Sequence, residues 1–192
     1  GQPIVIEGDA NNRPVFVGGG VGWQLSDCVH VTLRGLAVRG QSGNGLNIDD
    51  GGSYQTPAHH IVLEDIRVAE IGPTGNRDGI KLSGVDDFVV RNCSVEGWGG
   101  QAIDMVGCHR GLIENCRFQG KPGFSASAGP QTKGGSSEIV IRNCWFDRAG
   151  ERAVNLGGST GRAYFRPPGA MYEAKTITVE GCTFLGGMAP VA

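Results

Sequence analysis

The chain has 192 residues, a formal net charge of −2 and 34 glycines that follow no Gly-X-Y period. This charge excludes a general nucleic-acid binder, because phosphate contact needs a basic surface, and no apolar stretch is long enough to span a membrane. The glycines end short apolar runs, where a tight turn needs positive φ. The composition is therefore typical of an all-β protein.

One short pattern recurs along the whole chain. It occupies residues 44–51, 76–84, 101–107, 129–135 and 152–158. In each segment, apolar or small residues alternate with polar ones for four or five positions, and the run then stops at glycine. Alternation with a period of two predicts a half-buried strand that ends in a turn. We call these segments the floor strands.

A second strand pattern aligns six further segments, which start at Val31, Ile61, Phe88, Gly111, Ile139 and Ile177. Alternation predicts two inward columns in them: Leu36, Ile66, Cys93, Cys116, Cys144 and Cys182, and Val38, Val68, Val95, Phe118, Phe146 and Phe184. The four cysteines of the first column are 23, 28 and 38 residues apart. A unit of this length without any helical period indicates a solenoid.

Two strands per unit and glycine turns favour a single-stranded right-handed parallel β-helix. Leucine-rich repeats have a similar unit length, but they need a leucine pattern and a helical return that this chain lacks. We expect six to seven coils that form one domain over residues 1–192, each coil roughly 4.8 Å above the last. Both ends stop in mid-coil, so we also expect a fragment of a longer solenoid.

Loop insertions flank the floor strands on both sides. Residues 51–60 and 157–174 follow a floor strand, whereas residues 71–77 and 120–129 precede one. Loops on a rigid scaffold are where binding residues often lie. This placement predicts a groove over the floor strands, although sequence drift in solvent-exposed loops would give the same pattern.

Stacking the floor strands predicts three outward rows of side chains. The middle row is Asn47, Lys81, Asp104, Gln131 and Asn155; the far row is Asp49, Ser83, Val106, Lys133 and Gly157; the near row is Asn44, Asp78, Gln101, Ala128 and Arg152. We place Thr132 inward and Lys133 outward, because burying an unpaired ammonium is costly.

The middle row suits a chain of sugars that carry hydroxyls and carboxylates. In the long insertion, Tyr164 is expected to stack on a sugar face and Arg166 to bind a carboxylate in bidentate fashion. The alternative is structural: Lys81 and Asp104 form a surface ion pair, the amides form a ladder, and Tyr164 packs its loop onto neighbouring coils.

Two reactions could use such a floor. A polysaccharide lyase needs a base for the proton α to a uronate carboxyl, and Lys133 offers it, with Lys81 and Arg152 in the neighbourhood. Lys133 is preferred to Lys81 because we expect no carboxylate directly beside it. A glycoside hydrolase needs two carboxylates, and Asp78 and Asp104 would suit only the wider gap of about 6.5–9.5 Å.

Metal sites are a secondary expectation. A calcium ion could lie among Asp49, Asp50 and Asp78, because hard cations take carboxylate oxygens; otherwise no cofactor is expected. The histidines lie in an insertion or at turns: His30, His59, His60 and His109. No C-x-x-C pair is present, so zinc is not expected. The inward cysteines are interpreted as small buried apolar groups.

The repeated I-x-N-C-x-F units, such as IRNCWF, resemble those of the pectin-lyase-like right-handed parallel β-helix superfamily, and the resemblance covers the whole chain. Strings such as NGLNIDDGGS and RAVNLGGSTG also resemble an uncharacterised bacterial group of β-helix repeat proteins. Enzymes of the superfamily are mostly polysaccharide lyases and hydrolases. The resemblance implies a secreted, periplasmic or cell-surface protein.

The opening PIVIEG followed by RPVFVGG is similar to the start of the chondroitinase B and alginate lyase type. That type uses a lysine and an arginine as base and acid, which by position implies Lys133 and Arg152. The paired Asp with Gly-His-Gly of polygalacturonases is missing. We therefore predict a lyase for an acidic polysaccharide. A non-catalytic polysaccharide-binding or structural β-helix is the first alternative, and a hydrolase with paired Asp is the second.

Overall fold

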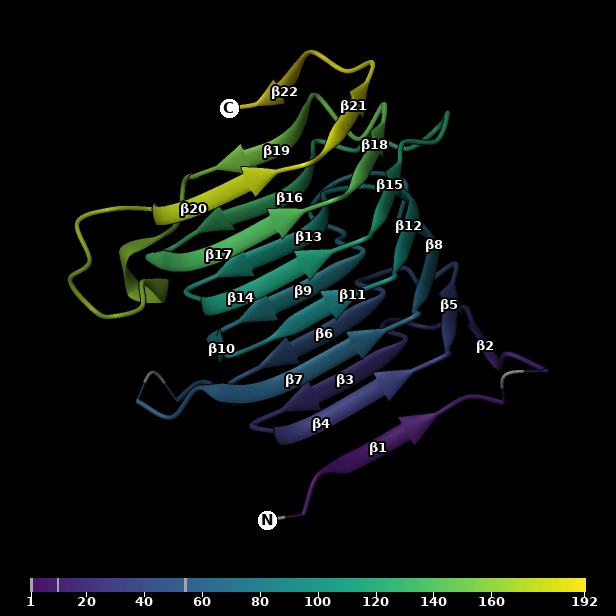
Figure 1. Cartoon of the computed structure of the whole chain (residues 1–192), viewed down its shortest axis with the longest axis horizontal. Coiled ribbons are helices and arrows are strands. Elements are labelled where there is room, and N and C mark those ends of the chain that lie inside the picture. The colour runs from purple at the N-terminus through teal and green to yellow at the C-terminus, as the bar shows by residue number, and fades with distance from the viewer. Residues whose placement is uncertain (1, 10, 54) are drawn as a thin grey trace.

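The computed structural model describes residues 2–9, 11–53 and 55–192. The chain winds into a parallel β-solenoid of about six turns, with the N-terminus at one end of the stack and the C-terminus at the other (Figure 1). The predicted all-β parallel β-helix is therefore confirmed. In the described part of the chain, no helix is long and apolar enough to cross a membrane.

Three parallel sheets form the walls of the solenoid. The floor sheet contains β3 (Trp23–Ser26), β6 (Leu46–Asp49), β9 (Ile80–Ser83), β13 (Gln101–Val106), β16 (Ala128–Lys133), β19 (Arg152–Leu156) and β22 (Ala189–Val191). The back sheet contains β1 (Ile4–Glu7), β4 (Val29–Arg34), β7 (Ala58–Glu64), β10 (Val85–Asp86), β11 (Val89–Arg91), β14 (His109–Glu114), β17 (Ser136–Arg142) and β20 (Ala174–Glu180). The side sheet contains β2 (Val15–Val17), β5 (Ala37–Arg39), β8 (Arg67–Ile71), β12 (Ser94–Trp98), β15 (Arg117–Gln119), β18 (Trp145–Asp147) and β21 (Thr183–Leu185).

A coil has three strands, not the two that the sequence pattern predicted. The second repeated segment bends once, between the back sheet and the side sheet, at a residue in the left-handed region. These corner residues are Gly35, Asp65, Asn92, Asn115, Asn143 and Gly181, with φ between 50° and 67°. Glycine, asparagine and aspartate tolerate this conformation. The asparagine of each N-C unit is therefore the corner of a coil, directly before the buried cysteine.

The two predicted inward columns form the core. Cys93, Cys116 and Cys144 are buried, and all six cysteines are free thiols. In the second column, the rings of Phe118, Phe146 and Phe184 stack at centroid distances of 5.0 and 4.8 Å. Each coil therefore repeats the contacts of the coil beneath it.

The predicted register of the floor sheet is also confirmed. Backbone pairing places Asn47 beside Lys81, Lys81 beside Asp104, Asp104 beside Gln131 and Gln131 beside Asn155. Thr132 is fully buried, and Lys133 keeps part of its side chain in solvent. The long loop, residues 157–173, connects β19 with β20 and includes the short 3₁₀ helix η1 (Arg162–Tyr164).

Candidate functional site

A pocket of about 360 Å³ opens over the centre of the floor sheet. Strands β9, β13 and β16 form its base, and the long loop forms one wall. Its lining residues are Asn76, Lys81, Ser83, Val106, Lys133, Ser159, Thr160, Gly161 and Tyr164. The floor strands and the long insertion thus meet at one hollow, as the groove prediction required.

One buried carboxylate holds both lysines of this pocket. The side chain of Asp104 has no exposed surface, and its Oδ1 lies 2.9 Å from Lys133 Nζ. Its Oδ2 contacts Lys81 Nζ. The Lys81 and Lys133 side chains are 18% and 16% exposed, so the two ammonium groups form the solvent side of the cluster.

The expectation that Lys133 has no carboxylate beside it is wrong. The backbone partner of Lys133 on β13 is Val106, which contributes no charge. The lysine side chain is long enough to reach diagonally to Asp104, two residues earlier on that strand. Residues diagonal across strands remain within reach of long side chains. Lys133 is therefore an ion-paired ammonium in this structure.

Asp78 is a second buried carboxylate beneath Lys81. Its Oδ1 accepts the backbone N–H of Gln101 at 2.9 Å, and its Oδ2 lies 3.8 Å from Lys81 Nζ. Burial, followed by the nearby charge of Asp104, raises the pKa of Asp78 from 3.8 to about 6, while Lys81 opposes the rise.

The paired-carboxylate hydrolase gains no support from this geometry. Side-chain exposure is 1% for Asp78 and 0% for Asp104. A general acid must come within hydrogen-bond distance of the glycosidic oxygen that it protonates, and these carboxylates lie beneath the lysines.

Arg152 does not share the pocket. It begins β19 and pairs with Ala128, five residues before Lys133 on β16. At about 3.3 Å per residue, this offset corresponds to roughly 16 Å along the strand. The structure therefore separates the lysine and arginine that the lyase resemblance implied as base and acid.

The amides of the middle row make contacts within the chain. Gln131 Nε2 donates to the carbonyl oxygen of Gly157 at 2.8 Å, at the start of the long loop. Asn47 Nδ2 donates to Asp49 Oδ2 at 2.9 Å. Asn155 lies beside Gln131 in the register and is half-buried. Gln131 and Asn47 thus donate hydrogen bonds within the chain, as expected if the amides have a structural role.

Arg166 anchors the long loop and does not face the pocket. Its buried guanidinium forms an ion pair with Asp50 and donates from Nη2 to the carbonyl oxygen of Ser53 at 2.7 Å. Its backbone N–H donates to the carbonyl oxygen of Gly134 at 2.9 Å. The carboxylate that Arg166 meets belongs to its own chain, so its predicted role in substrate binding is not supported.

The three candidate calcium ligands are engaged separately. Asp49 accepts hydrogen bonds from Gln24, Asn47 and the backbone of Gly51. Asp50 is paired with Arg166, and Asp78 lies beneath Lys81. Within the described ranges, the cluster of three metal-ligating side chains is formed instead by histidines on the back sheet.

The long loop contributes one exposed aromatic side chain and one fixed carboxylate. Tyr164 is 63% exposed and lines the pocket. Glu173 accepts the backbone N–H groups of Gly134 at 2.6 Å and of Thr160 at 2.8 Å. Burial alone would raise the pKa of Glu173, but these hydrogen bonds outweigh it and hold the pKa below its ordinary value. Sequence reasoning missed Glu173, because its partners are backbone amides that no side-chain pattern marks.

Comparison with known proteins is consistent with this architecture. Residues 19–189 match the family model described as the right-handed beta helix region. No curated protein and no solved structure gives a significant match. Because the matched region covers most of the chain, this protein belongs to the right-handed β-helix family.

Proposed function

We propose that the protein binds an acidic polysaccharide across the floor sheet, with a uronate carboxylate at Lys81 and Lys133. The observation that carries the proposal is the pocket in which these two partly exposed ammonium groups lie beside exposed Tyr164. Lysines supply the charge, and an aromatic ring supplies a flat apolar surface for a sugar face.

The charge of the cluster shifts in favour of an anionic ligand as the pH falls. Two ammonium groups share one fully buried carboxylate, Asp104, and Asp78 loses its charge as the pH falls through about 6. Below that pH the cluster is one charge more positive than at neutral pH, since Asp78 no longer offsets Lys81. We therefore expect tighter binding of a uronate polymer at pH 5 than at pH 7.5.

Lys81→Ala and Lys133→Ala should each weaken binding of a soluble polyuronate by about tenfold or more, since each removes a charge-assisted contact. Isothermal titration calorimetry would measure the affinity. Lys121→Ala is the matched control, because Lys121 forms surface ion pairs with Glu70 and Glu96 on the side sheet. Equal binding of an uncharged glucan, or unchanged affinity in both pocket variants, would contradict the proposal.

A second candidate function is β-elimination on the same polymer, favoured by the convergence of Lys133, Lys81 and Tyr164 on one pocket. Lys81 would neutralise the uronate carboxylate, and Lys133 would accept the proton α to it. The bond to the leaving oxygen would break, a carbon–carbon double bond would form in the ring, and the leaving oxygen would take up a proton. Lys133 would first have to part from Asp104 and release its own proton to solvent, because an ammonium group cannot accept one. The proton that it then takes from the sugar would pass to the leaving oxygen.

For this reaction, Lys133→Ala is expected to abolish the absorbance of the unsaturated product, while circular dichroism confirms that the fold is intact. Lack of turnover in the parent protein on every uronate polymer tested would leave binding as the function and exclude the lyase. Acidic polysaccharides of this kind occur outside cells, so the proposal places the protein among secreted, periplasmic or cell-surface proteins.

A further inference from the structure

Three histidines gather on the outer face of the back sheet, away from the proposed glycan site. His30 lies on β4, and His59 and His60 are consecutive on β7. Backbone pairing sets Val29 beside His59, so His30 and His60 occupy equivalent positions on neighbouring coils. The solenoid repeat therefore brings together histidines that are 29 or 30 residues apart in the sequence.

Local backbone conformation explains how consecutive side chains can converge. Successive residues of a regular strand point to opposite faces. His30 and His60 instead have φ values of 57° and 56°, in the left-handed region, which interrupts the alternation. His59 and His60 consequently lie ring to ring, with centroids 4.9 Å apart.

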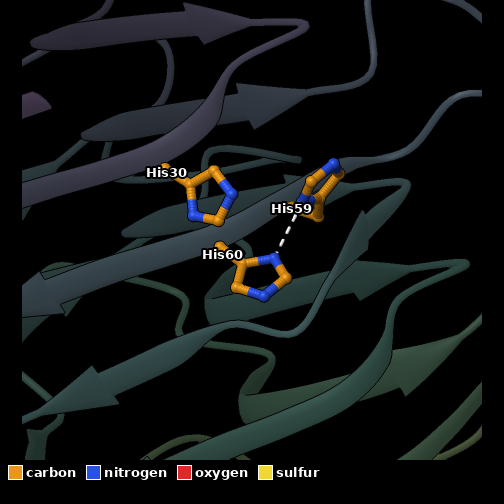
Figure 2. A group of neighbouring side chains, drawn as sticks. All are labelled: His30, His59 and His60. Carbon is orange, nitrogen blue, oxygen red and sulfur yellow. Dashed lines mark hydrogen bonds between the residues drawn. The ribbon is translucent and has the colours of Figure 1, made fainter. Parts of the chain in front are cut away.

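The rings are close enough to share one ion. One ligating nitrogen from each histidine lies within 4.8 Å of the others. The His30 ring centroid is 4.5 Å from that of His60 and 5.6 Å from that of His59. Figure 2 shows the three rings facing a common space, with His59 Nδ1 and His60 Nδ1 joined at 2.8 Å.

The chemistry of this donor set suits a divalent transition metal. Imidazole nitrogen is a preferred ligand of zinc, copper and nickel. A tetrahedral zinc ion with Zn–N bonds of 2.0–2.1 Å places its ligand nitrogens about 3.3 Å apart. The widest separation here would have to close by about 1.5 Å, which rotation of partly exposed rings can supply.

A carboxylate from the next coil lies beside the cluster. The next coil places Asp86 beside His59 in the register. Asp86 Oδ2 accepts from Arg110 at 2.9 Å, whereas its buried Oδ1 has no hydrogen-bond partner within the described residues. A carboxylate beside the histidines attracts a cation to the cluster.

We propose that His30, His59 and His60 form a binding site for a divalent transition metal ion, with zinc as the primary candidate. A fourth position stays open to water, since the described chain contributes three ligands to the cluster. The ion would also join β4 to β7 and so clamp two coils together. The expectation of no zinc rested on the missing C-x-x-C pair, a criterion that does not detect sites made of imidazoles alone.

Zinc binding to tag-free, metal-free protein can be measured by competition with a chromophoric chelator. One ion per chain is expected, and His30→Ala, His59→Ala and His60→Ala should each weaken the affinity by about 100-fold or more, because loss of a second-shell partner alone costs 10–100-fold. His109→Ala is the matched control: His109 lies on the same sheet and bonds to Ser137 at 2.9 Å, outside the cluster.

Two further measurements distinguish the histidine site from a thiolate site and from nonspecific zinc binding. Cobalt substitution should give the absorption spectrum of a nitrogen-ligated ion. This spectrum should be unchanged in Cys28→Ser, which removes the partly exposed thiol directly before β4. Zinc should raise the melting temperature of the parent protein and of His109→Ala but not of His59→Ala. Absence of stoichiometric binding, binding retained in all three cluster variants, or a sulfur-to-cobalt charge-transfer band would overturn the proposal.

Discussion

Replacement of Arg166 by methionine is expected to destabilise the protein by about 3–5 kcal/mol, the usual cost of breaking a buried ion pair by removing one partner. The side chains of Arg166 and Asp50 are 7% and 9% exposed, so the carboxylate would remain buried without its cation. The hydrogen bond to the carbonyl oxygen of Ser53 would also be lost. Urea denaturation followed by circular dichroism would measure the change.

Two comparisons sharpen this prediction. Arg148→Ala removes an exposed ion pair with Asp147 and should cost no more than about 1 kcal/mol. The double variant Asp50→Asn/Arg166→Met should lose less unfolding free energy than the two single variants lose together, because it leaves no buried charge without a partner. A loss in Arg166→Met no larger than that in Arg148→Ala would show that the pair does not anchor the loop.

The same substitution should expose the long loop to proteases. Residues 157–173 are tied to the second coil by Arg166 and to the turn after β16 by Glu173, which accepts from the Gly134 backbone. Without the first tie, cleavage near Tyr164 should accelerate, and the polyuronate affinity should fall because Tyr164 lines the pocket. Unchanged cleavage would indicate that the remaining hydrogen bonds of the loop, from Glu173, Gln131 and the Arg166 backbone, are enough to hold it.

Asp78→Asn is expected to stabilise the protein at neutral pH by about 3 kcal/mol, because a shift of one pKa unit corresponds to about 1.4 kcal/mol. Folding raises the pKa of Asp78 from 3.8 to about 6. A carboxyl group whose pKa is raised by folding stabilises the folded state fully at pH values below the pKa of the unfolded chain. This contribution is lost as the pH rises through the folded pKa of about 6. The carboxamide imitates the protonated form at every pH and keeps the oxygen that accepts from Gln101.

The difference in unfolding free energy between Asp78→Asn and the parent should therefore be near zero below pH 4 and grow up to about pH 6. Comparing the two proteins cancels the carboxylates whose pKa values folding lowers, such as Glu70 and Glu64, which stabilise the fold as the pH rises. Gln131→Asn is a non-titrating control on the same sheet. A difference that stays constant between pH 4 and pH 7 would refute the buried-carboxylate interpretation.

The sequence by itself determined the solenoid and the order of side chains along its floor. Alternation with a period of two separates inward from outward residues, and each coil contacts the coil that follows it in the chain. For that reason, aligning one repeat on the next amounts to stacking them in space. The middle row from Asn47 to Asn155 and the phenylalanine stack were predictable in this way.

Only the tertiary structure decided the contacts that do not follow the coil-to-coil register. Lys133 reaches Asp104 diagonally, because a long flexible side chain is not confined to its backbone partner. Arg166 bonds to Ser53 across 113 residues, through a loop whose path no periodic pattern encodes. The histidine cluster depends on left-handed φ values at His30 and His60, which the sequence does not mark with glycine. Because the scaffold repeats, it can be predicted from the sequence. The candidate sites depend instead on how far side chains reach, on the paths of loops and on local departures from strand geometry.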